Sequence, residues 1–196
     1  MSDGSRNIEL TRNVPGRRRR RDAEANRDRV LAAARRLHRR HGVGGMTMDA
    51  LATEAGVGKG TLYRGFGNRA GLAAALLDAT ERDLQERILT GPPPLGWGAE
   101  VEPADRLRAF VDAYLDLLAT DADLVVETER GAPGTRFHIG AYGFWHAHIA
   151  ALLRQQAHPS PTTRADVILS ALSAELYLHL CAQGATHPDI AEAILC

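Results

Sequence analysis

Hydrogen-bond donors of three kinds are grouped within residues 58–66. Two are cations, one is a hydroxyl group and one is a phenol: Lys59, Arg64, Thr61 and Tyr63. Cationic and hydroxyl donors suit phosphate oxygens, so these side chains are candidates for binding a nucleic acid. They can act together only where the chain presents them on one exposed surface, and the flanking sequence predicts such a surface.

A short helix is predicted immediately before this group. Thr47 can cap a helix that begins near Met48, because its hydroxyl group accepts a hydrogen bond from a free N–H group of the first turn. Gly56 ends this helix, since glycine adopts a positive φ without a Cβ clash. Four apolar residues share one face at the helical period: Met48, Leu51, Ala52 and Ala55.

A second short helix is predicted for residues 58–66. Leu62 and Phe66 are four residues apart and form its inward pair. The outward side chains are Thr61, Tyr63 and Arg64. Two helices joined by so short a turn suit insertion of the second one into the major groove of DNA. The residues alone therefore predict a helix-turn-helix unit.

The sequence from Thr47 to Leu72, which includes GVGKGTLYRGFGNRAGL, resembles the N-terminal domain of the TetR/AcrR family of bacterial transcriptional regulators. The resemblance implies an all-α fold, with an N-terminal three-helix helix-turn-helix domain and a helical C-terminal ligand-binding and dimerisation domain. It depends on several independent positions: Thr47, Ala52, Ala55, Gly56, Val57, the run Gly60-Thr61-Leu62-Tyr63, Phe66, Arg69 and Leu72.

The same resemblance implies roles for individual side chains in DNA binding. Lys59 and Tyr63 are the expected base-edge contacts, and Gly60 permits close approach of the backbone. The expected phosphate contacts, which position the protein without reading sequence, are Thr47, Thr61, Arg64 and Arg69. The alternative is that Tyr63 only packs against its neighbours and that Lys59 is only solvated.

One position departs from the family pattern. Gly65 stands where the family commonly has a histidine or another polar residue before the phenylalanine. Glycine removes an expected phosphate contact at this point. It also costs up to about 1 kcal/mol of helix propensity.

The composition favours packed helices. Of the 196 residues, 44% are hydrophobic and only 5% are aromatic. No apolar run reaches the roughly 18 residues of a membrane-spanning helix, and the N-terminus lacks an apolar signal core. We therefore expect a cytoplasmic protein with no membrane partner. Cys181 and Cys196 are expected to be free thiols, and no cofactor is expected.

Charge divides the chain into a basic front and an acidic back. Residues 1–64 hold 15 Lys and Arg against 7 Asp and Glu, a net charge of +8, and the remainder holds 9 against 17, a net charge of −8. This asymmetry suits a front domain that faces DNA. Residues 1–22 end in Arg17–Arg21 and are predicted to form a flexible basic arm. The arm could assist DNA binding, or it could be a solubilising tail.

The predicted domains follow the helical pattern. Residues 23–68 form the helix-turn-helix domain, with a first helix from about Ala23 that stops at Gly42. The residues spaced for its buried face are Val30, Ala34, Leu37 and His41. His38 and His41 lie three apart, but no carboxylate or cysteine joins them at a spacing that suits a metal.

Residues 69–196 are predicted to form a linker helix and the effector-binding and dimerisation domain. Asn68 can cap the linker helix, which runs to about Thr90. Residues 91–104 are rich in Pro and Gly and break the pattern. Later helices are expected from Asp105 onward, over residues 121–129, 136–157 and 162–183, and at the C-terminus over residues 189–195.

The helix expected over residues 162–183 is apolar on nearly every side, so it must be buried all round. Its own small domain can cover only one side. We therefore expect a homodimer through the late helices, which agrees with the resemblance.

An apolar cavity in the C-terminal domain is the expected effector site. The candidate lining residues are Phe110, Tyr114, Phe137, Trp145, His148, Glu175 and His179. Each of them could instead be an ordinary core residue. Glu175 and His179, four apart, could also form a buried ion pair or lie at the dimer seam.

These features predict a repressor dimer that places two recognition helices in successive major grooves of a pseudo-palindromic operator on double-stranded DNA. A small-molecule inducer would shift the linker helix and release the DNA. One alternative is a dimeric DNA-binding protein without an inducer. Another is an enzyme that uses His138, His146 and His148, but no nucleophile, phosphate-binding loop or paired carboxylate accompanies them.

Overall fold

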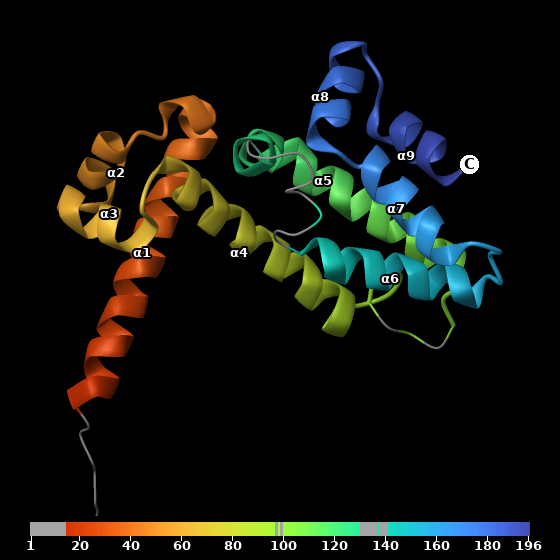
Figure 1. The fold of residues 1–196 in the computed structure, drawn as a ribbon, viewed down its shortest axis with the longest axis horizontal. Helices are drawn as coiled ribbons and strands as arrows, with labels where there is room; N and C mark the ends of the chain where they lie inside the picture. Colours follow the sequence, from red (N-terminus) through yellow and green to blue (C-terminus); the bar gives the residue numbers. More distant parts are fainter. Residues whose placement is uncertain (1–14, 97, 99, 130–136, 138–140) are drawn as a thin grey trace, which may run out of the picture.

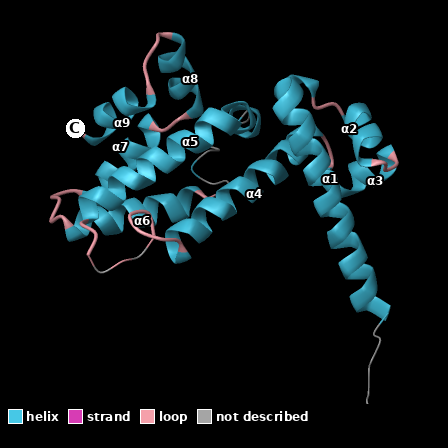
Figure 2. Cartoon of the chain, turned by 180° about the vertical axis from the view of Figure 1, so that it is seen from behind, coloured by secondary structure: helices cyan, strands magenta, loops and turns pink. Residues whose placement is uncertain are grey.

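The computed structural model describes residues 15–96, 98, 100–129, 137 and 141–196, with side chains from residue 21 onward. Within these ranges the chain is helical and contains no strand, which confirms the all-α prediction (Figures 1 and 2). The helices are α1 (Pro15–Gly45), α2 (Met48–Ala55), α3 (Lys59–Phe66), α4 (Arg69–Thr90), α5 (Pro103–Glu129), α6 (Tyr142–Gln155), α7 (Pro161–Ala171), α8 (Ala174–Ala182) and α9 (His187–Leu195).

Two apolar cores lie along the molecule, and α4 joins them. The first core collects side chains of α1 to α4 together with Leu124 of α5. The second is built from α4 to α9 around the fully buried Phe110 and Trp145. Leu76 of α4 packs in the first core and the adjacent Leu77 in the second. The first half of α4 thus packs mainly in the first core and its second half packs in the second core.

The caps expected around the helix-turn-helix unit are confirmed. The Thr47 hydroxyl accepts the Ala50 N–H at 3.1 Å, and Gly56 adopts the left-handed conformation with a φ of 64°. The Asn68 side chain accepts the Gly71 N–H at 2.9 Å and starts α4. These caps fix the angles between α2, α3 and α4.

Helix α1 differs from the expected first helix at its start and on its buried face. It begins at Pro15, well before Ala23, and its N-terminal half extends beyond α2 and α3 (Figure 1). The expectation that His41 lies on the buried face is wrong, because His41 is exposed and His38 is only 6% exposed. Both residues flank the apolar stripe. His38 is the one that is buried, because its partners lie on α5.

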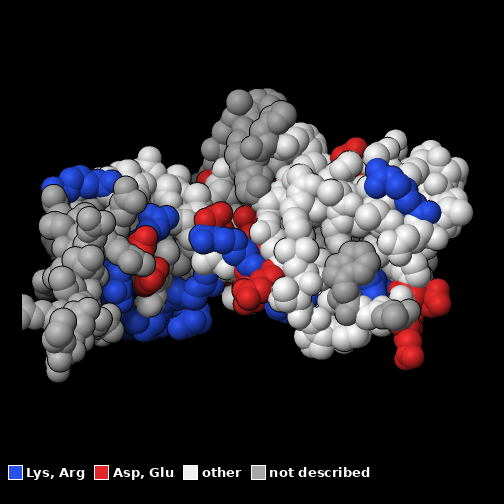
Figure 3. All heavy atoms as spheres, turned by 90° about the horizontal axis from the view of Figure 1, so that it is seen from below, with Lys and Arg blue, Asp and Glu red and all other residues white. Residues whose placement is uncertain are grey.

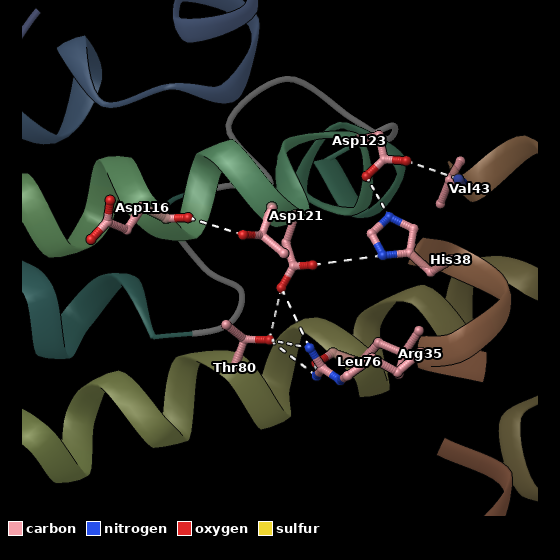
Figure 4. Close-up of polar contacts among 9 residues, drawn as sticks. Arg35, His38, Val43, Leu76, Thr80, Asp116, Asp121 and Asp123 are labelled. Atoms are coloured by element: carbon pink, nitrogen blue, oxygen red, sulfur yellow. Dashed lines mark hydrogen bonds and ion pairs between the residues drawn. The ribbon is translucent and has the colours of Figure 1, made fainter. Parts of the chain in front are cut away.

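Asp123 of α5 holds the end of α1 in place. The helical backbone of α1 is interrupted at Gly42, where φ is 63°, as the sequence predicts. Asp123 accepts the Val43 N–H at 2.8 Å through one oxygen, and its other oxygen lies 2.7 Å from His38 Nε2 (Figure 4). A carboxylate of α5 thus satisfies a backbone donor that the break leaves free.

Asp121, two residues earlier, forms a buried polar cluster between α1, α4 and α5. It is 1% exposed and accepts the Thr80 hydroxyl at 2.8 Å. Arg35 Nη1 lies 3.7 Å from the same carboxylate and also donates to Thr80 at 3.1 Å (Figure 4). His38 Nδ1 lies 3.7 Å from the other Asp121 oxygen, beyond hydrogen-bond distance. The cluster ties the helix-turn-helix region to the C-terminal helices.

Helix α5 is one continuous helix of 27 residues, so the expected separate helix over residues 121–129 is wrong. No glycine or proline interrupts the stretch, and α1 and α4 supply partners for its two buried or half-buried aspartates. Polar residues that satisfy each other across helices do not break the helix that carries them.

Residues 162–183 were expected to form one helix, but they belong to two helices. Helix α7 ends at Ala171 and Ser173 caps α8 by accepting the Leu176 N–H at 3.3 Å. Val167, Leu176 and Leu178 are exposed in the single chain, which agrees with the expectation that one protomer covers only part of this apolar stretch. Helix α6 begins at Tyr142, and residue 136 of its expected start is outside the described residues.

In the described part of the chain, no helix taken singly has both the length and the apolarity needed to cross a membrane. Helices α7 and α8 reach that threshold only when they are taken as a pair, and the pair is bent by 51°.

Candidate nucleic-acid interface and effector cavity

Helix α3 presents its predicted contact residues on an open surface beside α2. Leu62 is fully buried and anchors the helix, whereas Tyr63 is 52% exposed. Lys59, Gly60 and Arg64 are also exposed, and Thr61 is half-buried. A Cβ atom built at Gly60 would meet nothing within 4 Å, so another surface can approach the backbone there. The structure brings these five residues together on one short helix.

Lys59 forms an ion pair that the sequence does not predict. Its Nζ atom lies 2.8 Å from Asp49 Oδ1 of α2, and both side chains are mostly exposed. The hydrogen bond and the charge of Asp49 raise the pKa of Lys59. Lys59 is also the only lysine in the chain. Any phosphate or base that binds this ammonium group must compete with Asp49.

An Asp49→Asn variant is expected to bind DNA with a steeper salt dependence. Freed Lys59 can neutralise one more phosphate, so the slope of log K against log salt should become more negative by up to about 0.9. Fluorescence anisotropy with a labelled duplex measures the slope. The control is Asp83→Asn, an exposed position on α4. An unchanged slope in Asp49→Asn would contradict the competition.

The other predicted phosphate contacts differ in how far their hydrogen-bond donors are already used within the protein. Arg64 donates only a long hydrogen bond to Thr61, at 3.4 Å. Thr47 uses its hydroxyl oxygen as the cap of α2 but keeps its own O–H donor at the exposed surface. Arg69 donates to Glu127 Oε1 at 2.9 and 3.2 Å, so it ties α4 to α5. A DNA contact by Arg69 stays a prediction that must compete with this pair.

Arg27 of α1 holds the C-terminal end of α3. Its guanidinium group lies 4.8 Å from the centre of the Phe66 ring and donates to the Gly65 carbonyl at 3.5 Å. A hollow of about 280 Å³ lies beside this contact. Gly65 borders open space, because a Cβ atom there would meet nothing within 4 Å. The absent side chain thus leaves the surface of α3 uncovered next to Arg27.

A Gly65→Ala variant is expected to be more stable by about 0.5–1 kcal/mol, because alanine lowers the entropy cost of a helical position and nothing obstructs its methyl group. Urea unfolding followed by circular dichroism measures the change. Gly56→Ala is the matched control and is expected to lose about 1–2 kcal/mol, since Gly56 has a positive φ. A loss of stability in Gly65→Ala would show that the glycine is required by the backbone.

Cations cover much of the surface near α1 to α3. Figure 3 shows Lys and Arg side chains gathered over the left end of the molecule, where these helices lie, whereas fewer lie at the opposite end. Some of this charge is balanced locally, because Glu54 pairs with Arg36 at 2.9 Å and with Arg40 at 2.7 Å. The hydrogen bonds to these arginines lower the pKa of Glu54. The remaining exposed cations suit a phosphate backbone.

A cavity of about 360 Å³ lies between α4, α5 and α6, with Arg27 of α1 also in its wall. Two of the predicted effector residues, Tyr114 and Trp145, line it. Phe110 is fully buried and packs behind them, with ring centres 5.9 Å from Tyr114 and 5.8 Å from Trp145. These three aromatic residues therefore belong to one wall.

The other predicted effector residues lie away from the cavity lining. His148 packs against Phe110 at 5.4 Å, and burial, followed by the charge of Arg106, lowers its pKa to about 4. Phe137 is 47% exposed. Glu175 and His179 are exposed on α8 and are not brought to this cavity. Of the histidines in the enzyme alternative, His138 is outside the described residues and His146 lies 3.4 Å from Asp166.

Most residues of the cavity wall were not predicted as effector contacts, Glu81 and Arg27 among them. Glu81 falls on the apolar stripe of α4, four residues after Leu77 and three before Leu84, so the helical period could have found it. Arg27 lines both the cavity and the hollow beside α3. No spacing in the sequence indicates that Arg27 lies in both places, because its position depends on how α1 crosses α3 and α4.

Comparisons with known proteins agree with the geometry of this interface. Residues 30–76 match the sequence model of the family described as "Bacterial regulatory proteins, tetR family". An HTH-type transcriptional repressor from Streptomyces coelicolor is 33% identical over 99 residues, which are 50% of this chain and 48% of that protein. An HTH-type transcriptional regulator from Staphylococcus aureus is 38% identical over 65 residues, which are 33% of this chain and 34% of that protein. The chain thus spans at most about half the length of these relatives.

Solved structures share the fold over nearly the whole chain. A TetR transcriptional regulator from Rhodococcus sp. RHA1 aligns with a TM-score of 0.59 at 18% identity, over 89% of this chain and 93% of that chain. A transcriptional regulator of the TetR/AcrR type from Aquifex aeolicus aligns with a TM-score of 0.56 at 16% identity, over 87% and 95%. At these identities the likeness concerns the fold.

Proposed function

Because this chain belongs to the TetR family of DNA-binding transcriptional regulators, we propose that it is a homodimeric repressor that a small-molecule inducer releases from its operator. Residues 23–68 are the DNA-binding domain in this proposal, and residues 69–196 carry the linker helix, the effector site and the dimer contact. The protein acts in the cytoplasm, and its role is regulatory rather than enzymatic. The observation that carries the proposal is the exposed face of α3, with Lys59 and Tyr63 at its surface.

DNA recognition is assigned to α3 and its surroundings. Lys59 and Tyr63 contact base edges, and Gly60 lets the DNA approach the backbone. Thr47, Thr61 and Arg64 bind phosphates, with Arg69 as a further candidate. The N-terminal half of α1 carries Arg27 and Arg29 at its exposed surface and adds to this basic end.

The dimer contact is assigned to α7 and α8. Val167, Leu176 and Leu178 are 38–51% exposed in the single chain, and water is a poor environment for them. A second copy packed in a two-fold arrangement would cover them and would place two α3 helices on one pseudo-palindromic operator. Sedimentation equilibrium tests this assignment, and a monomer at micromolar concentration would contradict it.

The inducer site is assigned to the cavity between α4, α5 and α6. Arg27 touches this cavity and also contacts Gly65 and Phe66 at the end of α3. A ligand in the cavity that displaces Arg27 or shifts α4 would therefore change how α3 is held. Release follows only if the ligand binds the DNA-free state more tightly, with a coupling of about 1–3 kcal/mol.

The proposal is tested by selecting bound sequences from random duplex DNA and then titrating the complex with a metabolite library. A palindromic consensus and at least one releasing compound are expected. Selection of a consensus without any releasing compound would favour the alternative, a dimeric DNA-binding protein without an inducer. No enriched sequence would contradict DNA recognition itself.

A further inference from the structure

The walls of the cavity between α4, α5 and α6 are acidic. Asp78 and Glu81 come from α4, and Glu129 comes from the end of α5. Among the described lining residues the one cation is Arg27, and its guanidinium group lies over the Phe66 ring at 4.8 Å. Three carboxylates therefore line the cavity. Asp78 pairs with Arg82 and Glu129 has an interaction of its own, so Glu81 is the carboxylate that a bound cation would meet.

The same cavity has aromatic walls. Tyr114 and Trp145 lie edge to face with ring centres 6.1 Å apart, and Tyr142 joins them from the start of α6. Trp145 is 1% exposed, and its indole N–H has no hydrogen-bond partner among the described residues. This unpaired donor is available to a water molecule or to a bound molecule that carries a hydrogen-bond acceptor.

Glu81 is a partly buried carboxylate in the wall of this cavity. Its side chain accepts the Ala141 backbone N–H, and no Lys or Arg of the described chain forms an ion pair with it. Burial, followed by the charge of Asp78, raises the pKa of Glu81. Asp78, in contrast, is exposed and pairs with Arg82 at 2.7 Å. A positive charge brought into the cavity would stabilise the ionised form of Glu81.

We propose that this cavity binds an organic cation with an aromatic or otherwise apolar body, held between Glu81 and the rings of Tyr114, Tyr142 and Trp145. Carboxylates and aromatic faces both attract a cation, and the attraction grows where water is excluded. A volume of about 360 Å³ suits a small ligand. The inference rests on the proposed function in taking this cavity as the effector site.

Binding of matched probes to the full-length protein tests the ligand class. Phenyltrimethylammonium carries a permanent charge, and tert-butylbenzene has the same shape without it. Ligand-observed NMR titration is expected to show that the cation binds at least about tenfold more tightly than the neutral probe. Equal affinity for the two probes, or no binding of the cation at millimolar concentration, would overturn the proposal.

A Glu81→Gln variant separates the charge from the shape of the site. It is expected to weaken cation binding about tenfold and to leave tert-butylbenzene binding within twofold. Glu86→Gln makes the same change on the exposed side of α4 and is expected to alter neither affinity. Circular dichroism checks that both variants are folded. Unchanged cation binding in Glu81→Gln would remove Glu81 from the site.

The pH dependence gives an independent readout. Cation affinity is expected to rise as pH rises through the pKa of Glu81 and then to level off, because only the ionised carboxylate attracts the charge. The other charged or titratable groups in this wall are Asp78, Glu129, Arg27, Tyr114 and Tyr142. Glu81→Gln should flatten the profile. An affinity for the cation that falls as pH rises would contradict the proposal.

Operator release distinguishes this inference from the proposed function. If the cation binds and the operator complex is unchanged, the ligand class stands and the inducer mechanism fails. If the operator is released by a neutral or anionic compound while phenyltrimethylammonium does not bind, the inducer mechanism stands and the ligand class fails.

Discussion

An Asp121→Ala variant is expected to lose about 3 kcal/mol of unfolding free energy. Asp121 is 1% exposed, accepts the Thr80 hydroxyl at 2.8 Å and lies 3.7 Å from both Arg35 and His38. Removing a buried carboxylate leaves its partners without their counter-charge. Broken buried pairs typically cost 3–5 kcal/mol. The low end applies here, because Arg35 is 31% exposed and water can replace part of the interaction.

Urea unfolding of the two variants Asp121→Ala and Asp112→Ala gives the comparison. Asp112 lies on the same helix, but it is exposed and its contact with Arg108 is 3.9 Å, so its loss should stay within about 0.5 kcal/mol. A loss below about 1 kcal/mol in Asp121→Ala would mean that the cluster between α1, α4 and α5 is held by apolar packing alone.

Tyr63→Ala and Lys59→Ala are each expected to weaken binding to the selected operator about 10- to 100-fold, the scale of one lost base contact. Tyr63 is 52% exposed and Lys59 is an exposed cation of the same helix, so neither side chain is needed for the core. Tyr63→Ala should leave binding to random duplex nearly unchanged. Lys59→Ala should weaken both, because it also removes a charge.

Two further variants make these results specific. Tyr63→Phe removes only the phenol oxygen, so its affinity shows whether the hydroxyl group or the ring makes the contact. Arg154→Ala removes a cation from the exposed surface of α6 and should change operator affinity less than threefold. Affinity equal to the parent in both Tyr63→Ala and Lys59→Ala would show that α3 does not read the operator.

The sequence was sufficient wherever local chemistry decides the structure. Thr47, Gly56 and Asn68 cap or end helices through their own side chains or backbone freedom, and the structure confirms all three. The linker helix was correct at both ends for the same reason. The apolar stripe of α4 also carried information about the cavity, because Glu81 occupies a position on it where a leucine would be expected.

Features that depend on a partner from another helix could not be predicted. His38 and His41 are equally placed beside the apolar face of α1, and His38 is the buried one because Asp121 and Asp123 of α5 lie next to it. Continuity of α5 depends on partners that α1 and α4 give to Asp121 and Asp123. Conversely, α7 and α8 are separate helices because Ser173 caps α8, and a single serine within an apolar run gave no clear sign of a helix end. Distances of this kind arise from packing and leave no periodic pattern.

The pair between Lys59 and Asp49 bears on how the protein would search a chromosome. On random DNA, an ammonium group that already has a partner 2.8 Å away gains little from leaving it, so each encounter is brief. At the operator, a base acceptor placed at the right depth in the groove can replace Asp49, and the complex lasts longer. We therefore expect the acidic neighbour to shorten the time spent at wrong sites, and a variant without it to scan DNA more slowly.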